Sequence, residues 1–126
     1  MYEKQVPKDK ADEVYPLLFS TMRIGDIFVR YLMQYEILLG QVTKKHTQKE
    51  VVEYIEKVYN PANKDRQIGF QPTRKLGRKY KEDDLTYNRN LLGHGDIEKV
   101  VSEEKIRQLS RSIMDVLWFS LWNKSE

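Results

Sequence analysis

The chain has 126 residues, which suits one domain and leaves little room for a second. Its 40% hydrophobic and 33% charged residues can bury a core, which excludes general disorder. The absence of cysteine excludes disulfides, thiolate metal sites and cysteine nucleophiles, and two histidines are too few for a histidine-rich metal centre. We therefore expect no metal and no cofactor.

The remaining composition favours a soluble helical protein. With 6 glycines and 4 prolines the chain can build few turns, so long helices are favoured over many short strands. The first ten residues hold no apolar run, so no secretory signal is expected there. Charged residues interrupt the most apolar stretch, Leu17–Leu39, which argues against a membrane span. These features predict a cytoplasmic protein that does not enter a membrane.

The first helical pattern runs from about Asp12 to Val42, with Pro16 accepted in a first helical turn. Its apolar residues recur every three or four positions, as a helix that packs against a core requires. They are Leu18, Met22, Ile24, Ile27, Phe28, Tyr31, Leu32, Tyr35, Leu38 and Leu39. Asp26 and Glu36 interrupt this stripe and either stay at its wet edge or contact Arg89.

A second helix is predicted to begin at Thr47, because Thr47-Gln48-Lys49-Glu50 has the form of a capping box. Asn60-Pro61 is expected to end it, since the residue before a proline disfavours the helical conformation. His46, next to Lys44 and Lys45, is expected at the surface.

Residues 61–81 are the least regular part of the chain, and we expect a basic loop with at most one short helical turn. Asp65 is the only acid between Lys64 and Lys81. The residues proposed to contact RNA in this segment are Arg74, Lys75, Arg78, Lys79, Tyr80 and Lys81. They would form an arm that follows phosphates, with Phe70 or Tyr80 available to stack on bases. The alternative is an ordinary solvated loop.

A third helix is predicted over about Glu82–Leu92, because acids crowd its first turn and glycines flank His94 at its end. A fourth begins near Ser102 and carries a strong apolar stripe almost to the end of the chain. The fold class expected for residues 1–126 is therefore all-α. It is a single up-and-down four-helix bundle with a long basic loop between the second and third helices.

The most informative segment is Tyr87-Asn88-Arg89-Asn90-Leu91-Leu92-Gly93-His94-Gly95. The fork of donors on Arg89 suits a pair of phosphate oxygens, and His94 can exchange a proton near neutral pH. Together they could cleave RNA by attack of its own 2′-OH, without a metal ion. Residues five apart on a helix are rotated by roughly 140°. Gly93 is therefore expected to end the helix and let His94 turn back toward Arg89.

This segment resembles the signature of the HEPN superfamily, in which an arginine, usually followed by a polar residue, precedes a histidine with four to six residues between them. The resemblance implies a HEPN-type helical bundle and an endoribonuclease site containing Arg89, Asn90 and His94. It also implies a homodimer whose two arginine–histidine sets share one cleft, with Asn90 orienting the substrate or the histidine. Roles in toxin–antitoxin systems, phage defence or RNA processing follow from the same resemblance, as does a possible antitoxin or activating partner protein. Asp96 occupies the position where a toxin branch of the family carries a modified tyrosine, which puts that form of regulation in doubt.

Structural explanations exist for the same residues. Arg89 could pair on the surface with Asp83, Asp84 or a glutamate of the fourth helix, and His94 could simply cap a helix. The chain would then be a noncatalytic helical module that binds RNA or protein. It could equally be a small subunit of a larger assembly that docks through its fourth helix.

Overall fold

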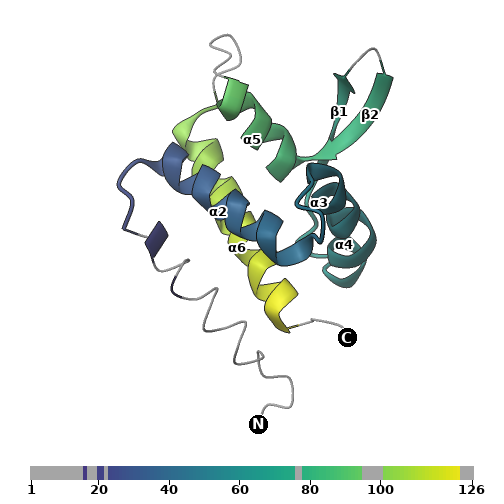
Figure 1. Ribbon diagram of the computed structural model, residues 1–126, viewed down its shortest axis with the longest axis horizontal. Helices are drawn as coiled ribbons and strands as arrows, with labels where there is room; N and C mark the ends of the chain where they lie inside the picture. The colour runs from purple at the N-terminus through teal and green to yellow at the C-terminus, as the bar shows by residue number, and fades with distance from the viewer. Residues whose placement is uncertain (1–15, 17–19, 22, 76–77, 95–100, 123–126) are drawn as a thin grey trace.

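The computed structural model describes residues 16, 20–21, 23–75, 78–94 and 101–122 (Figure 1). Within these ranges the side chains of residues 73–75, 78–79 and 93–94 are not described. The described chain is mostly helical, with one two-stranded antiparallel sheet, which confirms the expected predominance of helix. None of its helices is long and apolar enough to cross a membrane.

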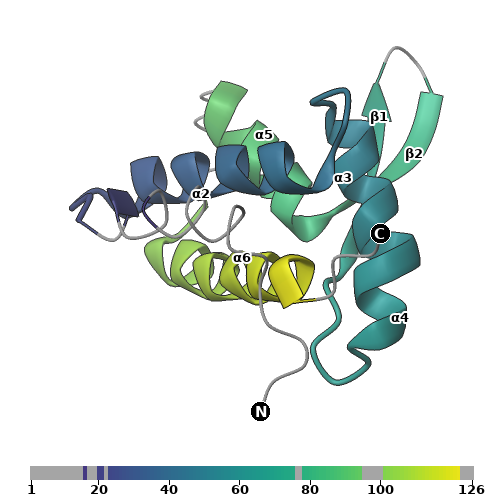
Figure 2. The same cartoon turned by 60° about the horizontal axis from the view of Figure 1, so that its bottom comes forward.

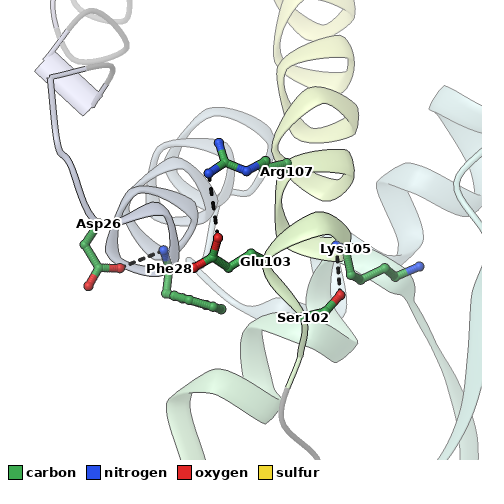
Figure 3. Close-up of polar contacts among 6 residues, drawn as sticks. All are labelled: Asp26, Phe28, Ser102, Glu103, Lys105 and Arg107. Atoms are coloured by element: carbon green, nitrogen blue, oxygen red, sulfur yellow. Dashed lines mark hydrogen bonds and ion pairs between the residues drawn. The ribbon is translucent and has the colours of Figure 1, made fainter.

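Helix α2, Ile27–Val42, is the central helix of the fold. It does not continue the pattern from Asp12, because a turn over residues 23–25 precedes it and Asp26 begins it. The Asp26 carboxylate accepts from the backbone N–H of Phe28 at 2.8 Å (Figure 3) and from that of Val29 at 3.2 Å. Asp26 is therefore an exposed helix cap, and the contact with Arg89 considered from the sequence is not made.

The second helical segment begins as the sequence predicts and ends later. Thr47 caps α3, Gln48–Tyr54, by accepting from the N–H of Glu50 at 3.3 Å, which confirms the capping box. The chain then passes through the π-helical segment η1, Ile55–Tyr59, into α4, Asn60–Ala62. The predicted end at Asn60-Pro61 was wrong, because Pro61 occupies the first turn of α4, where its missing N–H is tolerated.

The segment expected to be a basic loop contains a β-hairpin instead. Strand β1, Phe70–Lys75, pairs with β2, Arg78–Asp83, in an antiparallel register that sets Phe70 opposite Asp83. The sequence concealed these strands because charged residues occupy most of their positions, so the alternation of apolar and polar residues that marks a half-buried strand is missing. Figures 1 and 2 both show the hairpin projecting from the helical body.

Helix α5, Asp84–His94, follows β2 directly, and α6, Glu103–Trp122, is the last element. The prediction placed α5 over 82–92, two residues too early at each end. Ser102 caps α6 by accepting from the N–H of Lys105 at 3.1 Å, which confirms the predicted start (Figure 3). Beside this cap, Glu103 and Arg107 form a surface ion pair at 3.8 Å.

The core lies where α2, α5 and α6 meet, with α3, η1 and α4 closing one end (Figure 2). Helices α2 and α6 pack side by side and run in the same direction, whereas α5 runs the opposite way. The fully buried hydrophobic side chains that join these elements include Tyr31, Tyr35, Leu38, Val51, Ile55, Leu85, Ile106, Ile113, Val116 and Leu117. At the closed end, the rings of Tyr59 and Phe119 pack edge to face at 5.3 Å.

Replacing Asp26 by alanine should lower the free energy of unfolding by about 1 kcal/mol, because two N–H groups at the start of α2 lose their acceptor. Urea unfolding monitored by circular dichroism measures this change. Glu36→Ala is the matched control, because Glu36 is an exposed acid of the same helix that caps nothing and should change stability by less than about 0.5 kcal/mol. Equal effects of the two substitutions would contradict the cap.

Candidate functional site

A buried carboxylate holds the start of α5, the helix that carries the motif. Asp83 has no exposed surface, and its two oxygens accept from Thr86, one from the backbone N–H at 2.9 Å and one from the hydroxyl at 2.8 Å. Because the Thr86 hydroxyl gives its only hydrogen to Asp83, the Tyr35 hydroxyl at 2.7 Å donates to Thr86. This chain of hydrogen bonds links the first turn of α5 to α2.

Burial raises the pKa of the Asp83 carboxyl to about 6, although the hydrogen bonds from Thr86 oppose the shift. The neighbouring carboxylate of Glu82 raises it further, since two adjacent negative charges repel. The pKa of the Tyr35 hydroxyl is also raised by burial, and the same hydroxyl therefore stays protonated as a donor. Two neutral hydroxyl groups, those of Tyr35 and Thr86, therefore lie in line with the Asp83 carboxyl, whose pKa is above the usual value for an aspartate.

Tyr31 ties the same turn of α5 to α2 a second time. Its hydroxyl donates to the backbone carbonyl of Leu85 at 2.7 Å, and the ring is fully buried. Tyr31 and Tyr35 are four residues apart, so both lie on one face of α2. The first turn of α5 is thus fixed at two points before the motif begins.

Asn90 lies in a different set of contacts from the one expected. Its amide donates to Gln48 at 3.1 Å and to Glu82 at 3.2 Å, and its carbonyl oxygen accepts from Gln48 at 2.9 Å. Both amide hydrogens are therefore used within the chain, to join α5 to the start of α3 and to the end of β2. In this conformation Asn90 holds protein segments together, whereas the sequence suggested contact with substrate or histidine.

Arg89 is half-buried and lies close enough to Tyr35 for its charge to oppose the increase in that hydroxyl's pKa. The sequence allowed a surface ion pair with Asp83, Asp84 or a glutamate of α6. Within the described residues, which include all of these acids, Arg89 has no carboxylate within 4.0 Å. Among the described residues, the guanidinium near the buried network therefore has no carboxylate partner.

The helix does not end where the sequence suggested. Gly93 and His94 both belong to α5, so the expected turn of His94 back toward Arg89 does not occur in the backbone. An α-helix separates positions 89 and 94 by roughly 140° around its axis and roughly 7.5 Å along it. Positions 90 and 94 instead share a face. The His94 side chain, Gly95 and Asp96 lie outside the description.

The predicted RNA-binding residues lie on the hairpin whose second strand, β2, ends at the residue before α5, with most of them toward its outer end. Its register sets Arg74 opposite Lys79 and Lys75 opposite Arg78. Tyr80 is exposed at 38% and donates its hydroxyl to Glu82 at 3.3 Å, and Lys81 is exposed. Phe70 is partly buried against the core, so Tyr80 is the more exposed of the two rings considered for stacking on bases.

Other charged residues have structural partners or lie at the surface. Arg66, within the segment expected to be a basic loop, pairs with Asp115 of α6 at 3.8 Å. His46 is at the surface as expected, 3.7 Å from Glu36. No group of three or more histidine or carboxylate side chains in the described ranges is arranged to hold a metal ion.

Sequence reasoning did not find the residues that hold α5 in place, namely Gln48, Glu82, Asp83, Thr86 and Tyr35. One signal was available: Asp83 and Thr86 have the spacing of a helix cap and the third residue of its helix. Three successive acids, Glu82, Asp83 and Asp84, hid it, since any of them can begin a helix. The contact of Gln48 with Asn90 joins residues 42 positions apart, and no local pattern marks it.

Comparison with protein families, with curated proteins and with solved structures finds no significant match to this chain. The resemblance to HEPN proteins therefore depends on the residues of the motif.

The raised pKa of Asp83 predicts a specific dependence of stability on pH. The folded chain binds this proton more tightly than the unfolded chain, so the contribution of Asp83 to the free energy of unfolding falls as pH rises from about 4 to about 6. The gap of about two pH units corresponds to about 3 kcal/mol. Asp83→Asn cannot titrate, so the difference in stability between wild type and variant should shift by this amount between pH 4 and pH 7.

Urea unfolding at a series of pH values measures that difference. Asp65→Asn serves as control, because Asp65 is exposed and its removal should leave the fall in stability over this range in place. A constant difference between wild type and Asp83→Asn across the range would show that the Asp83 pKa is not raised.

Proposed function

We propose that this chain is a metal-independent endoribonuclease of HEPN type, with a site shared between two copies. The observation that carries the proposal is the position of Arg89 on α5, half-buried beside a fixed network and without a carboxylate partner among the described residues. A half-buried guanidinium without a carboxylate partner is suited to a phosphate group, whose charge it would neutralise with paired hydrogen bonds.

The chemistry follows from the two side chains of the motif. The 2′ oxygen of the substrate ribose attacks the adjacent phosphorus and the 5′ oxygen of the next nucleotide leaves, which yields a 2′,3′-cyclic phosphate and a 5′-hydroxyl. Arg89 stabilises the additional negative charge on the phosphorane. His94 moves a proton, either from the attacking 2′-OH or to the leaving 5′ oxygen. DNA lacks the nucleophile and should not be cut.

The requirement for a second copy follows from proton balance and helix geometry. One proton leaves the 2′-OH and one is needed by the leaving oxygen, so two imidazoles, one neutral and one protonated, serve the reaction better than one. Positions 89 and 94 lie on different faces of α5, so the arginine of one copy and the histidine of another are the more favourable pair at one phosphate. A twofold arrangement would supply both sets.

The surroundings of α5 support RNA as the substrate. Strand β2 of the basic hairpin leads directly into α5 at Asp83. One nucleic acid could therefore place some of its phosphates on the hairpin and others near the motif. A binding module without catalysis would use the same hairpin, and a subunit of a larger assembly would use the exposed face of α6. The experiment below distinguishes them.

Purified protein in EDTA should cleave RNA, and Arg89→Ala or His94→Asn should reduce the rate by about 100-fold or more while leaving the protein a folded dimer. Cleavage is followed by gel electrophoresis with identification of cyclic phosphate ends, and dimerisation by analytical ultracentrifugation. The matched controls are Arg111→Ala and His46→Asn, which remove an exposed arginine and the other histidine of the chain. Both controls should retain the activity.

Full activity of either motif variant would refute the assignment of that residue. Binding of RNA without cleavage by the wild type would establish the noncatalytic module instead. A monomer that cleaves RNA at full rate would refute the shared site while leaving the reaction itself intact.

A further inference from the structure

The outer part of the β1–β2 hairpin carries two cation pairs that face one another across the strands. Arg74 lies opposite Lys79, and the next pair toward the turn is Lys75 opposite Arg78. Like charges at directly opposed positions destabilise an antiparallel pair. The register thus places four basic residues at two successive pairs of positions, where a polyanion would offset the repulsion expected between like charges.

Successive cross-strand pairs lie on opposite faces of a ribbon, because the side-chain positions of a strand alternate with a period of two. The 74–79 pair and the 75–78 pair are adjacent in the register, so one cation pair belongs to each face. A hairpin that lies flat on a phosphate backbone uses only one of its faces. Cations on both faces are instead suited to two backbones, one on either side of the ribbon.

The base of the hairpin is fixed to the helical body. The Asp84 N–H donates to the Gly69 carbonyl at 2.8 Å, and Gln71 donates to the Asp84 carboxylate at 3.0 Å. Phe70 packs on the core, as described above. From this base the strands extend away from the helices in both views of the molecule, so their outer part can enter a groove without a collision of the body (Figures 1 and 2).

We propose that the hairpin inserts into a groove of a nucleic-acid duplex and contacts the phosphates of both strands. The major groove of B-form DNA accepts a two-stranded ribbon, and an A-form RNA duplex offers a wide, shallow minor groove instead. A single strand would instead require aromatic platforms for its bases, and of the two aromatic residues in these strands Phe70 is packed on the core. The inference rests on the proposed function only in taking nucleic acid as the partner, and it does not require cleavage.

The first test measures binding by fluorescence anisotropy with the full chain carrying His94→Asn, so that RNA substrates remain intact. The probes are a 20-base-pair RNA duplex, a DNA duplex of the same sequence and the corresponding single strands. A duplex should bind about tenfold or more tightly than its single strands, because two backbones supply phosphates to two faces. The RNA and DNA arms identify which duplex is preferred. Equal or tighter binding of the single strands would overturn the proposal.

The second test asks whether both faces take part. Arg74→Gln with Lys79→Gln removes one pair, and Lys75→Gln with Arg78→Gln removes the other. Each double variant should weaken duplex binding by a similar factor and reduce the slope of log K against log salt by about 2, the value for two lost phosphate contacts. If only one of the two double variants weakened duplex binding, the hairpin would lie flat on the nucleic acid, and the proposed insertion into a groove would be wrong.

Arg107→Gln with Arg111→Gln is the matched control, because it removes the same charge from α6 and should leave the slope nearly unchanged. The hairpin variants should fold, since each relieves a repulsive pair. Duplex binding through both faces by a wild-type protein that cleaves no RNA would refute the nuclease and leave this inference intact. RNA cleavage without a preference for duplexes would refute this inference and leave the nuclease proposal intact.

Discussion

The fold depends on one buried carboxylate at the junction of the hairpin and the motif helix. Asp83 ends β2, caps α5 through Thr86 and, through the same threonine, is linked to Tyr35 of α2. A buried carboxylate is stable only when its oxygens have donors, so the geometry of this junction is strongly constrained. The consecutive elements β2 and α5 are thereby joined to α2, which is distant in the sequence, and both candidate RNA-contacting segments extend from this junction.

Sequence periodicity identified the two helices that bury the most apolar surface. The apolar stripes of α2 and α6 could be predicted because their apolar residues recur at helical spacing. Tyr31, Tyr35 and Leu38 of α2 meet the apolar residues of 106–121 in the core. The helix caps at Thr47 and Ser102 could also be predicted, since a single side chain forms each cap. The hairpin could not be predicted in this way, because most positions of its strands are charged. Its contacts with the helical body lie at the base.

The motif was found as a string of residues, but its geometry required tertiary contacts. The side chain of Asn90 is occupied by Gln48 and Glu82, a consequence of how α3 and β2 approach α5 that no spacing within 87–95 encodes. Gly93 was expected to end the helix, yet the backbone remains helical through His94. The preceding part of α5 is held by tertiary hydrogen bonds at Leu85 and Asn90. Propensity at a single glycine, about 1 kcal/mol, is a weak determinant beside such contacts.

These constraints divide α5 into two functional halves. Asp83 caps its first turn through Thr86, and Thr86 and Leu85 hydrogen-bond the buried tyrosine hydroxyls of α2. Its second half carries the arginine and histidine positions and is held from the side by Asn90. A catalytic group gains from such support, because a side chain on a rigid helix loses less orientational freedom when it meets a phosphate. The same junction orients the hairpin, so a nucleic acid bound by the hairpin would meet α5 in a defined direction. If the hairpin binds nucleic acid as proposed, the buried network would therefore couple the direction of binding to the position of the residues proposed to react.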